Sequence, residues 1–144
     1  MNIDELEAGR ELDALVAERV MDEPMPRLLE HAPGHIMDVV YSTGKNWYCL
    51  LDFNDGDVCN WIPCPFSEHN TLMYRVLETF DTFTIRKESD GQIYVFVVRG
   101  NVWAEDTSAT IALAVCRAAL KAVTTAAVLR QRAAAAGAEG GSGA

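Results

Sequence analysis

Hydrophobic residues in the first 22 positions recur every three or four residues, which is the spacing of one face of an α-helix. The apolar positions of this stripe are Ile3, Leu6, Leu12, Leu15, Val16 and Val20. Asn2 precedes the stripe as the predicted N-cap, with Glu5 three residues later as in a capping box. Pro24 and Pro26 follow Asp22 and predict that the helix ends there.

The pattern changes near residue 36, where short runs rich in β-branched and aromatic residues alternate with turn residues. Three such runs, at residues 36–41, 47–53 and 58–62, predict a meander of short strands. Gly, Asn and Asp between the runs favour tight hairpins because these residues tolerate positive φ at low cost. Residues 24–64 are therefore interpreted as a strand meander inserted between two helices.

A second helical stripe follows residue 67. Ser67 is its predicted N-cap, and its apolar positions are Leu72, Met73, Val76, Leu77 and Phe80. Residues 82–87 and 92–98 then alternate with period two around a Ser-Asp-Gly turn, which predicts a hairpin. Residues 102–105 predict a third strand of the same antiparallel sheet.

An alanine-rich helix follows this sheet. Asp106, Thr107 and Ser108 are its candidate N-caps, and its apolar face contains Ile111, Val115, Ala119 and Val123, with Cys116 and Leu120 beside them. We expect the Ala- and Gly-rich residues 134–144 to form a flexible tail. The order of elements predicts one α+β domain over residues 1–133, in which helices cover a mainly antiparallel sheet.

Charge is distributed unevenly along the 144 residues. The chain has 12 basic and 21 acidic residues, a net charge of −9, which disfavours binding of nucleic-acid phosphates through a general basic field. Residues 1–23 contain eight acids and two bases, whereas residues 107–144 contain four bases and one acid. This opposition favours contact between the first and last helices. An acidic start and the lack of 18 consecutive apolar residues predict neither a membrane protein nor a secreted precursor.

Cys59, Cys64 and His69 are the candidate metal ligands. They have a Cys-x4-Cys-x4-His spacing, and zinc binds thiolates and imidazoles in a tetrahedron. The alternatives are a zinc site, a disulfide between the two cysteines and ordinary reduced thiols. The last is favoured, because structural zinc sites usually show a tighter Cys-x2-Cys spacing. Cys116 on an apolar helical face is expected to be a small buried hydrophobe.

Motifs of common enzyme classes do not occur in the sequence. It lacks a Gly-x-Gly-x-x-Gly, a phosphate-loop lysine motif, a His-Glu-x-x-His and a Gly-x-Ser-x-Gly. The histidines available as general bases are His31 and His35, in the loop before the first predicted strand, and His69 in the first turn of a helix. We therefore expect no catalytic residues, and an enzyme is the minority hypothesis.

Five residues are candidates for contact with a ligand or partner: Trp61, Phe66, His69, Arg117 and Lys121. Trp61 lies in a proline-bounded segment beside a helix N-terminus, where a tryptophan can line a pocket or anchor a partner. Arg117 and Lys121 lie one turn apart on the last predicted helix. They either contact an acidic partner or cover a solvated edge of the helix.

Three stretches of the sequence are familiar when taken together. They are Glu11 to Met21, Pro65-Phe66-Ser67 with the helix through Glu78, and Ala104 to Thr107 with the Cys-Arg-Ala-Ala-Leu-Lys-Ala run that begins at Cys116. Together they resemble the phage ABA sandwich domain family, small proteins of bacteriophages and prophages. The resemblance implies an α/β/α layered sandwich and brings no assigned activity or catalytic residue. Residues 24–64 do not share in it, and His69 stands where the family has an acidic residue.

These observations lead us to expect a phage or prophage accessory protein. It would bind a host or phage protein in the bacterial host cytoplasm, without catalysis, a cofactor, membrane contact or direct nucleic-acid binding. A homo-oligomer is compatible with the apolar content. The alternative is a small-ligand or metal-binding domain, with zinc as the metal, whose pocket lies near Trp61, Cys59, Cys64 and His69.

Overall fold

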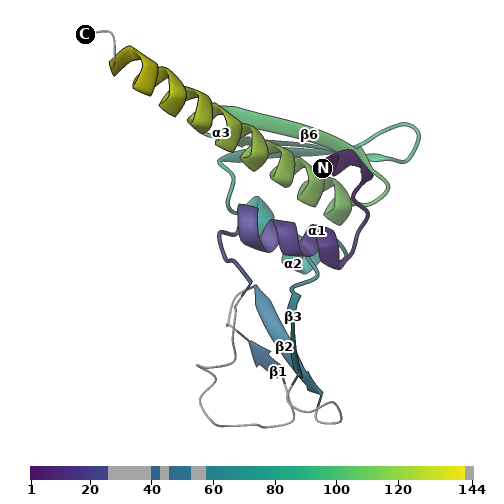
Figure 1. The fold of residues 1–144 in the computed structure, drawn as a ribbon. Helices are drawn as coiled ribbons and strands as arrows, with labels where there is room; N and C mark the ends of the chain where they lie inside the picture. Colours follow the sequence, from purple (N-terminus) through teal and green to yellow (C-terminus); the bar gives the residue numbers. More distant parts are fainter. Residues whose placement is uncertain (26–39, 43–45, 53–57, 142–144) are drawn as a thin grey trace.

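The computed structural model describes residues 1–25, 40–42, 46–52 and 58–141, which form helices and two three-stranded antiparallel sheets (Figure 1). In chain order the elements are the 3₁₀ helix η1 (Ile3–Glu5), α1 (Arg10–Leu15), the π-helical η2 (Val16–Val20), β1 (Val40–Ser42), β2 (Trp47–Asp52), β3 (Val58–Pro63), α2 (Asn70–Leu77), β4 (Thr82–Lys87), β5 (Ile93–Arg99), β6 (Val102–Ser108) and α3 (Ile111–Gly141). This architecture confirms the predicted α+β class.

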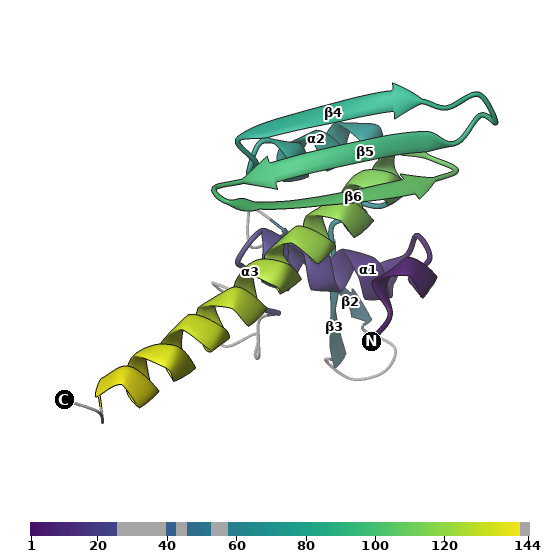
Figure 2. The ribbon, with the colours of Figure 1, turned by 90° about the horizontal axis from the view of Figure 1, so that it is seen from above.

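The core lies between the sheet formed by β4, β5 and β6 and the helices α1, η2, α2 and α3 (Figure 2). Strand β6 alternates strictly, so every second residue from Val102 to Ser108 is buried. The facing residues of α3 are mostly small, and the short side chains let the helix lie close to the strands. The buried alanines are Ala112, Ala114, Ala118, Ala119 and Ala122. Val115 and Leu120 add bulk between them and are fully buried.

Helices α1, α2 and the first half of α3 lie on the same side of the β4–β6 sheet (Figures 1 and 2). Trp103 in β6 points to the opposite side and is 58% exposed. The α/β/α arrangement implied by the family resemblance has helices on both faces of a sheet. In the part of the chain that the structure describes, helices cover one face of this sheet.

The first helix is interrupted, where the sequence predicted continuous helix to Asp22. Gly9, with φ of 152°, separates η1 from α1. Its backbone N–H donates to Ser67 Oγ at 3.0 Å, and the backbone N–H of Ser67 donates to Asp13 Oδ1 at 2.8 Å. Ser67 therefore joins α1 to the segment before α2 instead of capping α2, whose N-cap residue is His69.

The described parts of the predicted meander form the β1–β2–β3 sheet, while residues 26–39, 43–45 and 53–57 lie outside the described structure. Its base is fixed to the helical body through Glu23. Trp47, which is 2% exposed, donates from Nε1 to the backbone oxygen of Glu23 at 2.8 Å, and Asn46 Nδ2 donates to Glu23 Oε2 at 2.6 Å. Arg75 of α2 donates to Asn46 Oδ1 at 3.0 Å, which connects this corner to the second helix.

The boundary between β6 and α3 also differs from the prediction. The strand continues through Ser108, so the residues expected to cap the helix belong to β6. Thr110 performs the capping, because its Oγ1 accepts a hydrogen bond from the backbone N–H of Leu113 at 3.2 Å.

Helix α3 extends into the predicted tail and includes residues 134–141. Its second half projects away from the sheet (Figure 2), and the side chains from Val128 to Gly137 are all exposed. The helix over residues 111–137 is long and apolar enough to cross a membrane by length and composition, and its 18-residue apolar window has a mean hydropathy of 1.7. Of this window, 44% is buried inside the protein.

Candidate functional site

The predicted metal ligands lie near the end of β3 and the start of α2. Cys64 directly follows β3 and is half-buried, whereas His69 is exposed. Cys59 is in β3, but its side chain lies outside the described part of the structure, as do His31 and His35. Among the side chains that the structure describes, no three His, Cys, Asp or Glu residues are grouped to hold a metal ion.

The two aromatic candidates in this region belong to the hydrophobic core. Phe66 is fully buried, with the Arg75 guanidinium 5.7 Å from its ring centroid. Trp61 is half-buried and packs against the same core. Phe66 therefore has no surface available to a partner in this conformation, and its role is to pack α2 onto the body of the protein.

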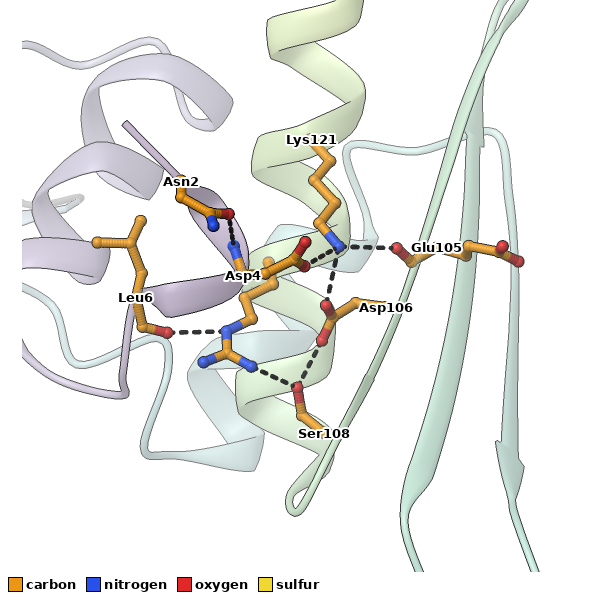
Figure 3. Close-up of polar contacts among 8 residues, drawn as sticks. Asn2, Asp4, Leu6, Glu105, Asp106, Ser108 and Lys121 are labelled. Atoms are coloured by element: carbon orange, nitrogen blue, oxygen red, sulfur yellow. Dashed lines mark hydrogen bonds and ion pairs between the residues drawn. The ribbon is translucent and has the colours of Figure 1, made fainter.

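Arg117 and Lys121 lie one turn apart on α3, as predicted. Lys121 reaches toward β6 and the N-terminal segment (Figure 3), and Arg117 bonds to the same two parts of the chain. Arg117 Nε donates to the backbone oxygen of Leu6 at 2.8 Å, and Arg117 Nη1 donates to Ser108 Oγ at 3.1 Å. The guanidinium thus bridges two segments that lie on opposite sides of it. These contacts fix the N-terminal segment against the last helix.

Lys121 completes this polar cluster by contacting two carboxylates. Its Nζ lies 2.5 Å from Asp4 Oδ1 and 3.0 Å from Asp106 Oδ1. The Asp106 side chain is only 4% exposed, and its second oxygen accepts a hydrogen bond from Ser108 Oγ. The hydrogen bond from Lys121 lowers the pKa of Asp4. Partial burial opposes the charged form of Lys121, but its bonds to Asp4 and Asp106 outweigh this effect and raise its pKa.

A second surface, which the sequence analysis did not single out, is the face of the β4–β6 sheet opposite the helices. Strand pairing places three rows of side chains on it: Thr82, Val98 and Trp103; Thr84, Phe96 and Glu105; and Arg86, Tyr94 and Thr107. We call this surface the open sheet face. Phe96 and Trp103 are in contact on it, with ring centroids 5.6 Å apart.

One edge of the open sheet face is ordered by polar contacts around Tyr94. The Arg86 guanidinium lies 4.6 Å from the Tyr94 ring centroid, and the Tyr94 hydroxyl donates to Glu105 Oε2 at 2.6 Å. This hydrogen bond raises the pKa of Tyr94. Arg86 is held in turn by Glu88 at 3.0 Å. The Phe96–Trp103 pair and an ordered polar border therefore lie together on the open sheet face.

The sequence did contain a signal for this surface. In β5 both sets of alternate residues are apolar, as seen in the run Ile-Tyr-Val-Phe-Val-Val from Ile93 to Val98. Such a continuous run is typical of a strand that is covered on both faces. Helix α3 packs against one set only, and the other set contributes to the open sheet face.

Comparisons with known proteins bear on the fold. The sequence matches no protein-family model and no curated protein. Its structure is similar to the crystal structure of a phage protein from Bacillus cereus ATCC 14579, with a TM-score of 0.51 and 16% sequence identity. The match covers 83% of this chain and 95% of that protein. At this level of identity, the likeness shows that the two proteins share a fold.

Proposed function

We propose that this chain is a phage or prophage accessory protein that binds a host or phage protein without catalysis, and that the open sheet face makes the contact. Two observations support the phage setting. Three stretches of sequence resemble a phage protein family, and the fold is similar to that of a phage protein from Bacillus cereus.

The two-sided apolar character of β5 is the observation that carries the binding proposal. A central strand with one solvated face normally alternates apolar and polar residues. Here the set on the open sheet face contains Tyr94, Phe96 and Val98, and a bound partner would remove their apolar surface from water. Trp103, 58% exposed, extends the same apolar surface onto β6.

The composition of the open sheet face also suits contact with a protein. Interfaces are enriched in aromatic residues and arginine at their centre and are bordered by polar groups. The Phe96–Trp103 pair supplies such a centre, and Arg86 and Glu105 supply part of the border. Because Tyr94 is already held by two polar contacts, little side-chain freedom is lost on binding.

Affinity purification from infected or lysogenic bacterial cells tests this proposal, with Trp103→Ser as the variant and Tyr74→Ser as the matched control. Tyr74 is 54% exposed on α2, on the helix side of the sheet. The captured protein is identified by mass spectrometry, purified, and titrated against each form. Loss of a central tryptophan should weaken binding by about thirtyfold, because hot-spot truncations cost about 2 kcal/mol or more.

Either of two results would overturn the proposal. One is a partner that binds Trp103→Ser and wild-type protein equally well. The other is a partner whose binding is lost to the same degree in Tyr74→Ser, which would place the contact on the helix side. Thermal unfolding of both variants checks that the fold is retained, and sedimentation of the purified protein shows whether the bound partner is a second copy of this chain.

A further inference from the structure

A surface hollow of 380 Å³ lies between η2, the end of β5 and the middle of α3. Three arginines line it, one from each element: Arg19, Arg99 and Arg130. Most of the remaining lining is apolar and includes Val20 and Val102. We call this site the arginine hollow. Its volume is within the range of about 300–1,000 Å³ that is usual for small-molecule sites.

The charges in the arginine hollow are poorly neutralised by the protein itself. The side chains of Arg19 and Arg130 form no hydrogen bond or ion pair with any residue in the described ranges. Asp22 is the acid in the lining, and Asp81 interacts electrostatically with Arg99 from outside the lining. In a chain with 21 acids and 12 bases, a hollow with this excess of cations is an exception to the overall charge. It attracts anions to one place on an acidic protein.

Arg99 is held in position before any ligand arrives. Its Nε donates to the backbone oxygen of Thr79 at 3.0 Å, and its Nη2 donates to Thr79 Oγ1 at 2.6 Å. The guanidinium also lies 4.4 Å from the ring centroid of Phe80. Nη1 forms no hydrogen bond to another described residue, so this fixed guanidinium retains free donors. Fixed arginine donors match the geometry of phosphate and carboxylate oxygens.

We propose that the arginine hollow binds a small organic dianion, whose oxyanion groups pair with Arg19, Arg99 and Arg130 while its apolar part packs on Val20 and Val102. Three cations against one lining acid favour a doubly charged ligand, and the apolar walls favour an organic one. The hollow lies on the helix side of the sheet. Binding there is therefore independent of the open sheet face, and either proposal can fail without the other.

Isothermal titration calorimetry at about 0.15 M ionic strength, where charges outside the site are screened, tests the proposal with defined probes. Phenyl phosphate and phthalate are dianions on an apolar ring, and comparing them distinguishes a phosphate from a dicarboxylate ligand. Inorganic phosphate, at a pH where it is mainly a dianion, has the charge without the ring. We expect at least one of the two ring dianions to bind about fivefold or more tightly than inorganic phosphate, because only the ring can bury apolar surface.

Substitutions of single arginines assign the site. Arg130→Gln and Arg19→Gln should each weaken binding about tenfold or more, since each removes a charge-assisted hydrogen bond. Arg132→Gln is the matched control, because Arg132 is exposed two residues further along α3 and is not among the lining residues. It should change the affinity less than about twofold, as the effect of a charge outside the site is screened. Circular dichroism of each variant confirms that the fold is retained.

Three results would overturn the proposal. Equal weakening by Arg130→Gln and Arg132→Gln would indicate general attraction to a basic helix end. Inorganic phosphate that binds as tightly as both ring dianions would exclude the apolar contact. No heat of binding and no amide chemical-shift change with either ring dianion at millimolar concentration would show that the hollow is not a site for this class of ligand.

Discussion

Replacement of Lys121 by methionine tests whether the polar cluster in Figure 3 holds β6 and the N-terminal segment on α3. Methionine retains much of the length of lysine but has no ammonium group. The Asp106 carboxylate, 4% exposed, would then lose its charged partner and keep only the hydrogen bond from Ser108. In the variant, the buried Asp106 carboxylate therefore keeps one hydrogen bond but has no positive charge beside it.

The expected loss of stability is about 2–3 kcal/mol. Removing one partner of a fully buried ion pair costs about 3–5 kcal/mol. Two features reduce this value here: the Lys121 side chain is 27% exposed, and Asp106 retains the Ser108 hydroxyl. The Asp4 contact adds little, about 0–1 kcal/mol, because that side chain is 66% exposed. In a domain of this size, the melting temperature should fall by about 5–10 °C.

A double-mutant cycle measured by urea unfolding at pH 7 isolates the pair. The cycle compares wild type, Lys121→Met, Asp106→Asn and the double variant. The double variant should lose about 1–2 kcal/mol less than the sum of the single losses, because with the carboxylate replaced no buried charge remains unpaired. Additive losses within about 0.3 kcal/mol, or a Lys121→Met loss below about 0.5 kcal/mol, would refute the reasoning.

The same pair predicts a pH dependence at the alkaline end. The pKa of Lys121 is raised in the folded protein, so its stabilising contribution is fully present below its unfolded value of about 10.4. The contribution is lost as the pH rises through the folded value. The unfolding free energies of wild type and Lys121→Met should therefore converge above about pH 10.4. A constant difference up to pH 11.5 would contradict the assignment.

Three further substitutions and treatments test other parts of the fold. Burial raises the pKa of Asp13 above 3.8 despite its bonds to Ser67, so the contribution of Asp13 to wild-type stability should fall as the pH rises from 3.8 through the folded pKa. Urea unfolding should therefore show that Asp13→Asn gains stability relative to wild type over that range, and parallel stability curves of the two proteins would contradict this. Asp22 has φ of 57°, so Asp22→Gly should stabilise the protein by about 0.5 kcal/mol in thermal unfolding, whereas Asp22→Ala should not. The Cys116 thiol is fully buried and its pKa is raised by burial, so iodoacetamide should label it only in urea; peptide mapping that finds native labelling would disprove the packing.

The spacing of apolar residues predicted the strands and helices well, because it differs between a helix and a strand. The alternation in residues 82–87 and 92–98 depends on neighbours in the chain, and the structure has β4 and β5 within one residue of these ranges. The break at Gly9 could not be predicted in this way. It depends on Ser67, which is 58 residues away and holds the Gly9 amide. Similarly, the buried Asp106 and Ser108 belong to β6 because Arg117 and Lys121 satisfy their oxygens from another element.

The candidate sites were harder to predict than the fold, because residue type does not show what a side chain faces. Phe66 and Arg117 suited a binding role by type, but one is buried and the other bonds to Leu6 and Ser108. Conversely, the apolar run in β5 was visible in the sequence, but its meaning depended on which face α3 leaves uncovered. That information is tertiary, since it depends on how helices are distributed between the two faces of the sheet.

The basic residues of α3 show how charge is divided between stability and binding. The opposition between an acidic N-terminus and a basic C-terminus predicted contact between the two ends, and the bond between Lys121 and Asp4 confirms it. That contact uses only the first part of the basic segment. Arg130, about three and a half helical turns from Arg117, has no acidic partner among the described residues and lines the arginine hollow. If the basic segment served only to hold the N-terminus, Arg130 would contribute nothing, because it lies too far along α3. Arg130→Gln would then change neither the stability of the protein nor its affinity for dianions.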